Sequence, residues 1–393
     1  MKRKLRITAL AVCASVLLCS CGNTPALADT TTTSETTAAE ETAVSVDHGE
    51  MRDIPLKELI AEMHTGWNLG NTMDAPGGET SWGNPVTTRE MIDMVYDAGF
   101  DVIRIPTTWD QHIDDENGYK IDEDWLARVH EIVDYAFDNG MYVILNTHHE
   151  TGWIKPATKE LDSFMPRFEA LWTQIAESFE GYGDHLLFEG LNEPRIEGGA
   201  NEWNGGTKDG REALNVLNKK FVDTVRATGG NNSKRALLIT TFAAAVVDST
   251  LKALEVPDDD RVLVSLHAYT PYNYTFHPMS EWETYEFTEY VAGDIDNLFT
   301  TIDSYFLSKD IPVIITEYGS QSKSVPIYET RTDDENVKWV TYYLEKAKEY
   351  GVPCVWWDNN SYYGSGERFG LLDRANLKWY VPQVVEAIGK VYN

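Results

Sequence analysis

The sequence predicts an α/β protein with a single (β/α)8 TIM barrel, and three observations support this fold. Eight short apolar runs follow one another along the chain, and helical segments lie between most of them. Strands that alternate with helices form parallel sheets, and eight such units in about 340 residues favour a closed barrel over a doubly wound sheet. Polar and aromatic residues also cluster at the C-terminal end of nearly every run.

The predicted elements follow from the spacing of apolar residues. The eight predicted strands are residues 66–69, 102–106, 142–145, 186–189, 236–239, 262–266, 313–315 and 353–357. Between them, apolar residues recur at the period of an amphipathic helix. The clearest predicted helices are residues 88–96, 122–137, 211–226, 333–349 and, after the last strand, 381–391. The segment between the fifth and sixth strands is short and poorly helical.

The composition is that of a globular protein with an acidic surface. Hydrophobic residues make up 42% of the chain and charged residues 24%, and the formal net charge is −30. Nucleic acids and anionic membrane surfaces bind basic patches, so we expect neither as a partner. The chain has 12 Trp and 20 Tyr, which is more aromatic surface than a core needs. The excess favours a neutral, faceted ligand such as a sugar.

Residues 1–20 resemble a lipoprotein-type signal peptide. A basic start precedes an apolar segment, residues 7–18, that is too short to span a bilayer. Residues 18–22 resemble a bacterial lipobox, in which Cys21 is lipidated and becomes the new N-terminus. An Ala-x-Ala sequence at residues 26–28 leaves ordinary secretory cleavage as the alternative. We therefore expect an extracellular or cell-surface protein that reaches the membrane only through a lipid anchor at Cys21.

The rest of the chain divides into a linker and one domain. Residues 21–48 are rich in Thr, Ala, Glu and Ser without apolar periodicity, which predicts a flexible linker. No second linker follows, so residues 49–393 are predicted to form one catalytic (β/α)8 domain, acting as a monomer. Only one of the four cysteines, Cys354, lies in this domain, which excludes an internal disulfide and implies a large core.

Two glutamates indicate the chemistry. Glu193 follows the fourth predicted strand in Leu-Asn-Glu-Pro, and Glu317 ends the seventh in Thr-Glu-Tyr-Gly. Strands four and seven lie across the mouth of a barrel, so the two carboxylates can face each other. A retaining glycosidase needs such a pair about 5–5.5 Å apart, one as nucleophile and one as acid and then base. Either glutamate alone reads equally well as a solvated loop charge, but the pair in this layout predicts glycoside hydrolysis.

These motifs resemble glycoside hydrolase family 5, a retaining family of clan A. The resemblance covers the whole body of the chain and leaves out only the signal peptide and linker. Further matching positions are Arg104 in Ile-Arg-Ile-Pro, His148 in Thr-His-His-Glu, His267 and Tyr269 in His-x-Tyr, and the pair Trp356-Trp357. Residues 66–72 and 81–85 are similar to the endoglucanase subfamily usually numbered 4, which includes cellulases, lichenases and xyloglucanases.

The resemblance and the chemistry imply roles for the central residues. Glu193 is expected to be the acid/base, with a pKa raised by burial and by the opposing carboxylate. Glu317 is expected to be the nucleophile, with Arg104 holding its pKa down. The alternative for Arg104 is a structural ion pair under the barrel floor. Tyr269 is expected to donate a hydrogen bond to the nucleophile, and His267 to belong to the glutamate network.

A second group is expected to bind or support the sugar. Asn192 is expected to contact the sugar 2-OH, although it also fits a turn residue before a proline. His148 resembles an active-site histidine of the family, and His149 and Asn68 are expected to support the site.

Aromatic side chains are expected to form the sugar-binding surfaces. Trp357 is predicted to be the platform under the sugar at the cleaved bond, with Trp356 facing the packing, and the reverse assignment is the alternative. Further aromatic residues follow strand ends, and some of them are expected to form outer sugar subsites: Trp82, Trp109, Trp153, Trp203, Trp282, Tyr272 and Tyr363.

The adjacent histidines raise the possibility of a metal site, but the pattern does not favour one. Consecutive residues of a strand point to opposite faces, so His148 and His149 are not expected to bind the same ion. The sequence has no His-Glu-x-x-His motif and no cysteine cluster. We therefore expect neither a metal nor a cofactor.

The leading hypothesis is a retaining endo-β-1,4-glucanase that cleaves cellulose, mixed-linkage glucan or xyloglucan by double displacement. A β-mannanase or a xyloglucanase on the same fold is the first alternative. The second is a non-catalytic sugar-binding surface lipoprotein, which usually has two lobes and needs no buried acid pair. In each case the expected partner is a polysaccharide or oligosaccharide, a β-glucan in the leading hypothesis.

Overall fold

The computed structural model describes residues 48–276, 286–323, 333–364 and 366–392. Eight parallel strands close into a barrel, which confirms the predicted fold. In order around the barrel they are β1 (Thr65–Leu69), β2 (Val102–Ile105), β5 (Tyr142–Asn146), β6 (Leu186–Glu189), β7 (Leu237–Ala245), β8 (Val262–His267), β9 (Val313–Tyr318) and β10 (Cys354–Asp358), which pairs with β1. All eight predicted runs are barrel strands.

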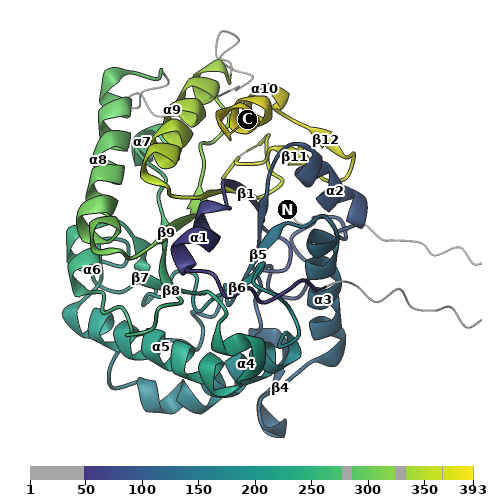
Figure 1. Cartoon of the computed structure of the whole chain (residues 1–393), viewed down its shortest axis with the longest axis vertical. Helices are drawn as coiled ribbons and strands as arrows, with labels where there is room; N and C mark the ends of the chain where they lie inside the picture. The colour runs from purple at the N-terminus through teal and green to yellow at the C-terminus, as the bar shows by residue number, and fades with distance from the viewer. Residues whose placement is uncertain (1–47, 277–285, 324–332, 365, 393) are drawn as a thin grey trace, which may run out of the picture. The chain divides into compact units, whose positions relative to one another are not determined.

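Helices surround the barrel, as Figure 1 shows. The outer helices are α2 (Arg89–Asp97), α3 (Glu123–Asp138), α4 (Leu161–Ser178), α5 (Lys208–Ala227), α6 (Asp248–Ala253), α8 (Glu289–Tyr305), α9 (Asp334–Tyr350) and α10 (Pro382–Tyr392). The five helices predicted by residue range are confirmed to within a few residues at each end. The helix between β7 and β8, α6, is only six residues long, in keeping with the weak helical pattern there.

Side-chain caps explain where several helices begin. The side chains of Thr88, Asp122, Thr207 and Thr288 each accept a hydrogen bond from a backbone N–H in the first turn of α2, α3, α5 and α8. Such caps satisfy N–H groups that a helix leaves without an intrahelical partner.

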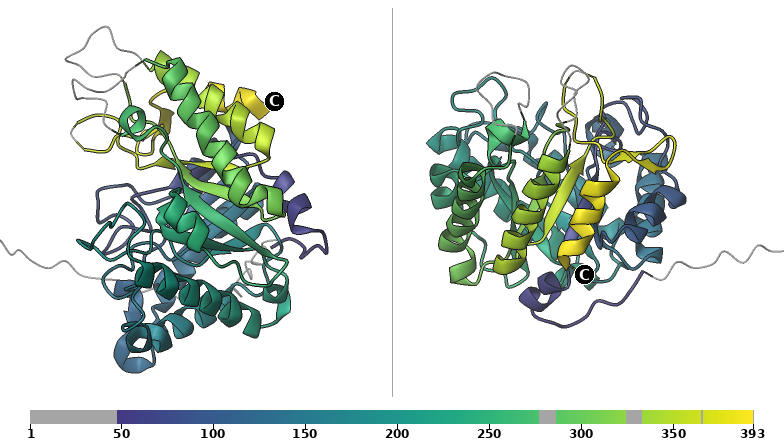
Figure 2. Two further views of the ribbon diagram at one scale, coloured as in Figure 1. Left: turned by 90° about the vertical axis from the view of Figure 1, so that its left-hand side faces the viewer. Right: turned by 90° about the horizontal axis from the view of Figure 1, so that it is seen from above.

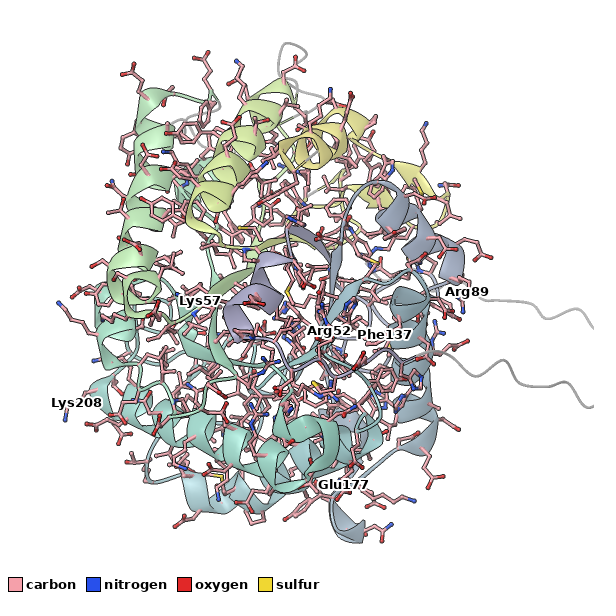
Figure 3. All side chains as sticks on the ribbon, in the orientation of Figure 1. Arg52, Lys57, Arg89, Phe137, Glu177 and Lys208 are labelled. Atoms are coloured by element: carbon pink, nitrogen blue, oxygen red, sulfur yellow. The ribbon has the colours of Figure 1, made fainter. Side chains whose placement is uncertain are left out.

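Short elements decorate the loops. They are the helix α7 (Tyr272–Thr275), the 3-10 turns η1 (Asp110–His112), η2 (Asp115–Asn117), η3 (Gly230–Ser233) and η4 (Leu307–Lys309), and the two-stranded pairs β3 (Ile113–Asp114) with β4 (Lys120–Ile121) and β11 (Leu372–Asp373) with β12 (Lys378–Trp379). Charged side chains project outward around the helical ring, with Lys208 and Arg89 on opposite edges in Figure 3.

The core has two layers. The larger one lies between the strands and the helices and includes Trp172, Trp339 and Trp356. The smaller one fills the barrel, where Leu59 and Ile60 of helix α1 (Leu56–Ala61) belong to the same cluster as inward-facing strand residues. Helix α1 therefore closes the N-terminal end of the barrel (Figures 1 and 2). The opposite end, where the strands finish, is the end at which barrel enzymes place their active sites.

The chain joins the barrel near residue 48. The backbone N–H groups of Gly183 and Asp184 donate to the carbonyls of His48 and Glu50. The predicted signal peptide, the lipidation site Cys21 and the predicted linker up to residue 47 lie outside the described residues. Among the residues that the structure describes, no helix is both long and apolar enough to cross a membrane.

Candidate active site

Arg104 is the centre of a buried polar network at the mouth of the barrel. Its guanidinium lies on β2, fully buried, and makes hydrogen bonds to four side chains from other strands and loops. The acceptors are Glu189 Oε2 at 2.7 Å, Asn68 Oδ1 at 2.9 Å, Glu317 Oε1 at 2.8 Å and Asn192 Oδ1 at 2.6 Å. Burial disfavours the cation, but the Glu189 and Glu317 carboxylates outweigh it and raise the pKa of Arg104. Arg104 therefore contacts the predicted nucleophile and also forms a buried ion pair with Glu189, and both contacts lie at the mouth of the barrel rather than under its floor.

Glu189 is a part of this network that sequence reasoning missed. It ends β6, is fully buried, and accepts hydrogen bonds from Asn146 Nδ2 at 2.9 Å and from the Ser265 hydroxyl as well as from Arg104. The signal was an acidic residue inside an otherwise apolar strand. A buried carboxylate needs such partners because desolvation is costly.

Asn68 on β1 holds Arg104 in place by a hydrogen bond. Its Nδ2 amide donates to the carbonyls of Thr316 at 2.9 Å, Trp356 at 3.1 Å and Val355 at 3.2 Å, so β1 is tied to β9 and β10 at this level. Its Oδ1 atom accepts from Arg104. Asn68 is fully buried and contributes to the site through Arg104.

Glu317 and Glu193 face each other across His267. Tyr269 donates its hydroxyl to Glu317 Oε2 at 2.8 Å. His267 Nδ1 lies 3.0 Å from Glu193 Oε1 and 3.4 Å from Glu317 Oε2. One carboxylate oxygen of each glutamate and a ring nitrogen of His267 all lie within 4.8 Å of one another. This separation matches a retaining pair and is shorter than the 6.5–9.5 Å of an inverting pair.

The pKa directions expected for the two glutamates are wrong. Burial is the largest influence on Glu317 and raises its pKa, although His267 and Arg104 lower it. Burial also raises the pKa of Glu193, but the hydrogen bond and charge of His267 and the charge of Arg195 outweigh it, so the pKa is lowered. The sequence did not reveal that these two cationic side chains both contact Glu193.

His267 supplies a positive charge that both glutamates contact. Burial disfavours its charge, but the Glu317 and Glu193 carboxylates raise its pKa above the ordinary value. A proton that Glu193 gives up in the free site therefore has an acceptor 3.0 Å away. The three groups share their protons and titrate as a unit.

His148 and His149 lie side by side, which corrects the expectation that they face opposite ways. Their rings are 4.5 Å apart and perpendicular. Strand β5 ends at Asn146, so strand alternation no longer applies to them. His148 Nδ1 lies 3.2 Å from Asn146 Nδ2, and burial together with nearby cations lowers the pKa of His148 well below its ordinary value. His148 is thus neutral and carries its proton on Nε2.

Two sets of described residues have a spacing that could hold a metal ion. One is the glutamate pair with His267, and the other is Asp74 with His148 and His149. In the second set His149 Nε2 lies 3.7 Å from Asp74 Oδ2, an ion pair when the ring is protonated. The first set is already connected by the hydrogen bonds described above. The expected absence of a metal stays a prediction.

The two tryptophans of β10 divide as predicted. Trp356 is buried in the layer between barrel and helices and donates its indole N–H to the Phe369 carbonyl at 2.8 Å. Trp357 lies parallel to His148, with ring centroids 5.7 Å apart. A Cβ atom at Gly70 would come within 2.9 Å of the Trp357 ring, which explains the glycine there.

Other predicted aromatic residues have mixed outcomes. Trp82, Trp203, Tyr272 and Tyr363 are exposed, as a sugar contact requires. Trp109 is fully buried and donates its indole N–H to the Asn146 carbonyl, so its prediction as a possible subsite is wrong. Trp153 is half-buried against Glu150, and Trp282 lies outside the described residues.

The fold and the carboxylate pair define a glycoside hydrolase of the retaining type. Comparison with known proteins agrees. The model of the cellulase family, glycosyl hydrolase family 5, matches residues 68–363. Endoglucanase A of Ruminococcus albus is 50% identical over 346 residues, which cover 86% of this chain and 93% of that protein. The protein therefore belongs to glycosyl hydrolase family 5.

Two solved structures resemble this chain over nearly their full lengths. A broad-specificity endoglucanase from Ruminococcus champanellensis with bound cellotriose is 41% identical, with a TM-score of 0.82 over 87% of this chain and 100% of that one. A xyloglucan-specific endo-β-1,4-glucanase from a metagenomic library, in complex with cellotriose, is 44% identical, with a TM-score of 0.81 over 85% of this chain and 98% of that one.

Proposed function

We propose that this protein is an endo-β-1,4-glucanase that cleaves β-glucans with retention of configuration. The observation that carries the proposal is the pair Glu193 and Glu317, whose nearest oxygens lie within 4.8 Å at the mouth of the barrel. This spacing leaves room for an anomeric carbon beside one carboxylate and a glycosidic oxygen beside the other. A non-catalytic sugar-binding protein has no need of this costly buried arrangement.

In the first step, Glu317 attacks the anomeric carbon and Glu193 protonates the departing oxygen. Arg104 and Tyr269 each bond one oxygen of Glu317, so the carboxylate is fixed before substrate arrives. Asn192 presents its Oδ1 atom to Arg104, which leaves its Nδ2 amide as the donor to the sugar 2-OH. That contact strengthens as the oxocarbenium-like transition state forms.

In the second step, Glu193 takes a proton from water, which attacks the glycosyl ester and releases Glu317. Formation of the ester removes the negative charge of Glu317, so the repulsion that disfavours ionisation of Glu193 disappears. Trp357 is the platform for the sugar being transferred, with the neutral His148 beside it as a donor.

The proposed substrate class rests on the relatives. The relatives named above are endoglucanases, one of them xyloglucan-specific, and two solved structures hold cellotriose. Xyloglucan is therefore the favoured second substrate beside unbranched β-1,4-glucans and mixed-linkage glucan. A panel of these polysaccharides and glucomannan, scored by reducing-sugar release, ranks them. A clear preference for glucomannan over every β-glucan would contradict the assignment.

We also propose that the enzyme is held at the cell surface by a lipid on Cys21. The support is the lipobox-like sequence at residues 18–22 and the Thr-rich segment that follows. Labelling of the expressed protein with a radioactive fatty acid should depend on Cys21. Equal labelling of Cys21→Ala, or release of the unchanged enzyme into the medium, contradicts the anchor.

The catalytic assignment is tested by replacing each glutamate with glutamine. Glu317→Gln should lower kcat on soluble glucan by about 10⁴-fold or more, and Glu193→Gln by about 10²–10⁴-fold, with substrate binding retained. Glu58→Gln on the exposed face of α1 is the matched control. NMR should detect the β-anomer as the first product. Unchanged hydrolysis by Glu317→Gln, or release of the α-anomer first, contradicts the proposal.

A further inference from the structure

Arg195 contacts the predicted acid/base and is not explained by the mechanism above. It follows Glu193 by two residues, and its Nη1 atom donates to the Glu193 carbonyl at 3.2 Å and lies 3.5 Å from Glu193 Oε2. The Arg195 side chain is only 15% exposed, so water screens this interaction weakly. A fixed cation beside the acid/base affects whichever step needs that residue ionised.

The loop after Glu193 holds the guanidinium of Arg195 from its other sides. Glu202 Oε1 accepts from Arg195 Nε at 3.0 Å, and Glu202 Oε2 accepts from the Gly198 N–H at 2.8 Å. The Arg195 Cζ atom lies 4.3 Å from the centroid of the Trp203 ring. Arginine stacked on tryptophan loses rotational freedom, so the loop sets the position of the charge.

The backbone that carries Glu193 is also fixed. The Pro194 carbonyl accepts a hydrogen bond from Ala243 N at 3.0 Å. Ala243 and Ala244 have φ values of 56° and 51°, in the left-handed region that residues other than glycine rarely adopt. Strained backbone of this kind is typical of functional sites, and here it sets where Glu193 and Arg195 leave the barrel wall.

Other charged groups act on Glu193 as well. They are His267 on β8, Glu317 on β9, His149 after β5 and Glu367 after β10. His267 can release its proton to Glu193, whereas an arginine guanidinium is a permanent cation that donates hydrogen bonds and gives up no proton. Arg195 therefore favours the carboxylate form of Glu193 constantly, which opposes its role as an acid and assists its role as a base.

We propose that Arg195, held by Glu202 and Trp203, is a positioning residue that favours the base form of Glu193 for the second step of the reaction. In that step a water oxygen bonds to the anomeric carbon and a water proton passes to the Glu193 carboxylate. The bond between the anomeric carbon and Glu317 breaks, and its electron pair returns to Glu317. This inference rests on the proposed function.

The test uses a substrate that isolates the second step. With a dinitrophenyl β-cellobioside the leaving group needs no proton, so hydrolysis of the intermediate limits kcat. Because Arg195 lowers the pKa of Glu193, Arg195→Gln should raise it and move the acid limb of kcat upward by about one pH unit. Below that limb, kcat and KM should fall together by up to about tenfold, and kcat/KM should stay within about twofold.

On polysaccharide, the acid form of Glu193 is the one required in the first step. The alkaline limb of kcat/KM should therefore also move upward in Arg195→Gln. Arg195→Lys keeps the positive charge, so both limbs of its pH profiles should lie close to those of the wild type. Arg226→Gln, which breaks an ion pair with Asp259 away from the site, is the matched control and should move neither limb.

The outcomes separate this inference from the proposed function. If Glu317→Gln is inactive but Arg195→Gln shifts neither limb, or lowers kcat and kcat/KM equally on both substrates, Arg195 is only structural and the inference is wrong. If Glu317→Gln keeps its activity, the proposed function itself fails. Should Arg195→Gln not fold, Trp203→Ala removes the ring that holds the guanidinium of Arg195 without changing any charge, and should shift both limbs in the same direction by a smaller amount.

Discussion

The two glutamates of the site have opposite surroundings. Glu317 lies within strand β9, its side chain is 7% exposed, and Arg104 and Tyr269 each hold one of its oxygens. Glu193 lies beyond the end of β6, its side chain is 21% exposed, and its contacts are His267 and Arg195. One carboxyl is part of the barrel wall, whereas the other is carried by a loop.

This difference fits the work each carboxyl is proposed to do. A nucleophile must be ionised and positioned at the start of every turnover, so it benefits from Arg104 on β2 and His267 on β8, which strand pairing holds in register. An acid that becomes a base must gain and lose a proton in each turnover. It needs a partner such as His267 that can exchange one, and access to the water that reacts.

The largest expected effect comes from removing Arg104, the centre of the buried network that holds Glu317. Arg104→Met removes the cation that the buried carboxylates of Glu189 and Glu317 share, and leaves Glu317 with His267 and Tyr269 only. Loss of one partner of a buried ion pair costs about 3–5 kcal/mol, so the free energy of unfolding from urea titration should fall by that amount. Activity at a temperature where the variant stays folded should also fall strongly.

A surface ion pair gives the matched control for Arg104→Met. Lys219 and Asp223 pair on the exposed face of α5, with side chains 66% and 54% exposed. Lys219→Met should change the unfolding free energy by less than about 0.5 kcal/mol, because exposed pairs contribute little. Equal losses in the two variants would show that Arg104 is not the centre of the network.

The fold and most of the residues around the predicted nucleophile, Glu317, could be predicted from the sequence. Each strand is a short apolar run, and the polar residue that ends it marks the mouth, which is how Arg104, Glu193 and Glu317 were found. Glu189 was missed because the residues next to it in the sequence do not show which side chains it will contact. Its contacts Asn146 and Ser265 come from neighbouring strands, and only barrel closure brings them together.

The surroundings of the predicted acid/base, Glu193, were harder to predict because they depend on the conformation of loops. Arg195 is an ordinary arginine in the sequence, and its contact with Glu193 follows from a turn whose path is set by Ala243 and Glu202. The pKa directions failed for the same reason, since they depend on distances of a few ångströms between loop and strand residues. His149 was misplaced because strand alternation ended three residues earlier, at Asn146.

Glu150 is another buried carboxyl near the site, and its surroundings differ from those of both glutamates. Glu150 accepts the Trp109 backbone N–H and the Trp153 indole N–H, each at 2.6 Å, and neither donor is charged. Burial raises the pKa of Glu150 from 4.5 to about 7. The folded protein thus holds a proton that the unfolded chain releases between these pH values, so the stability contributed by Glu150 is lost as pH rises through this window.

Glu150→Gln should remove this pH dependence. From pH 4.5 to above 7, the unfolding free energy of the wild type should fall by up to about 3 kcal/mol relative to the variant. Thermal or urea unfolding of both proteins across the range measures the difference, in which the titration of all other groups cancels. A difference that is constant with pH would mean that Glu150 ionises in the folded protein as easily as in the unfolded chain.

The smallest expected effect comes from removing the hydrogen bond to only one of the two carboxylate oxygens of Glu317. Tyr269→Phe removes the hydroxyl that donates to Oε2 and keeps the ring packed against Phe276 and Phe369. A hydrogen bond to a charged group contributes about 1.5 kcal/mol, so kcat/KM should fall roughly tenfold with little loss of stability. That bond also lowers the pKa of Glu317, so the acid limb of the pH profile should move upward in the variant.

The control for Tyr269→Phe is Tyr182→Phe, which removes a hydroxyl that donates to Asp134 at 2.6 Å outside the site. It should leave both limbs of the pH profile in place. If Tyr269→Phe also leaves the acid limb in place, the Tyr269 hydroxyl does not affect the ionisation of Glu317. The barrel strands would then control the nucleophile through the charges of Arg104 and His267, and the contrast with the loop-borne Glu193 would rest on these charges rather than on the number of donors.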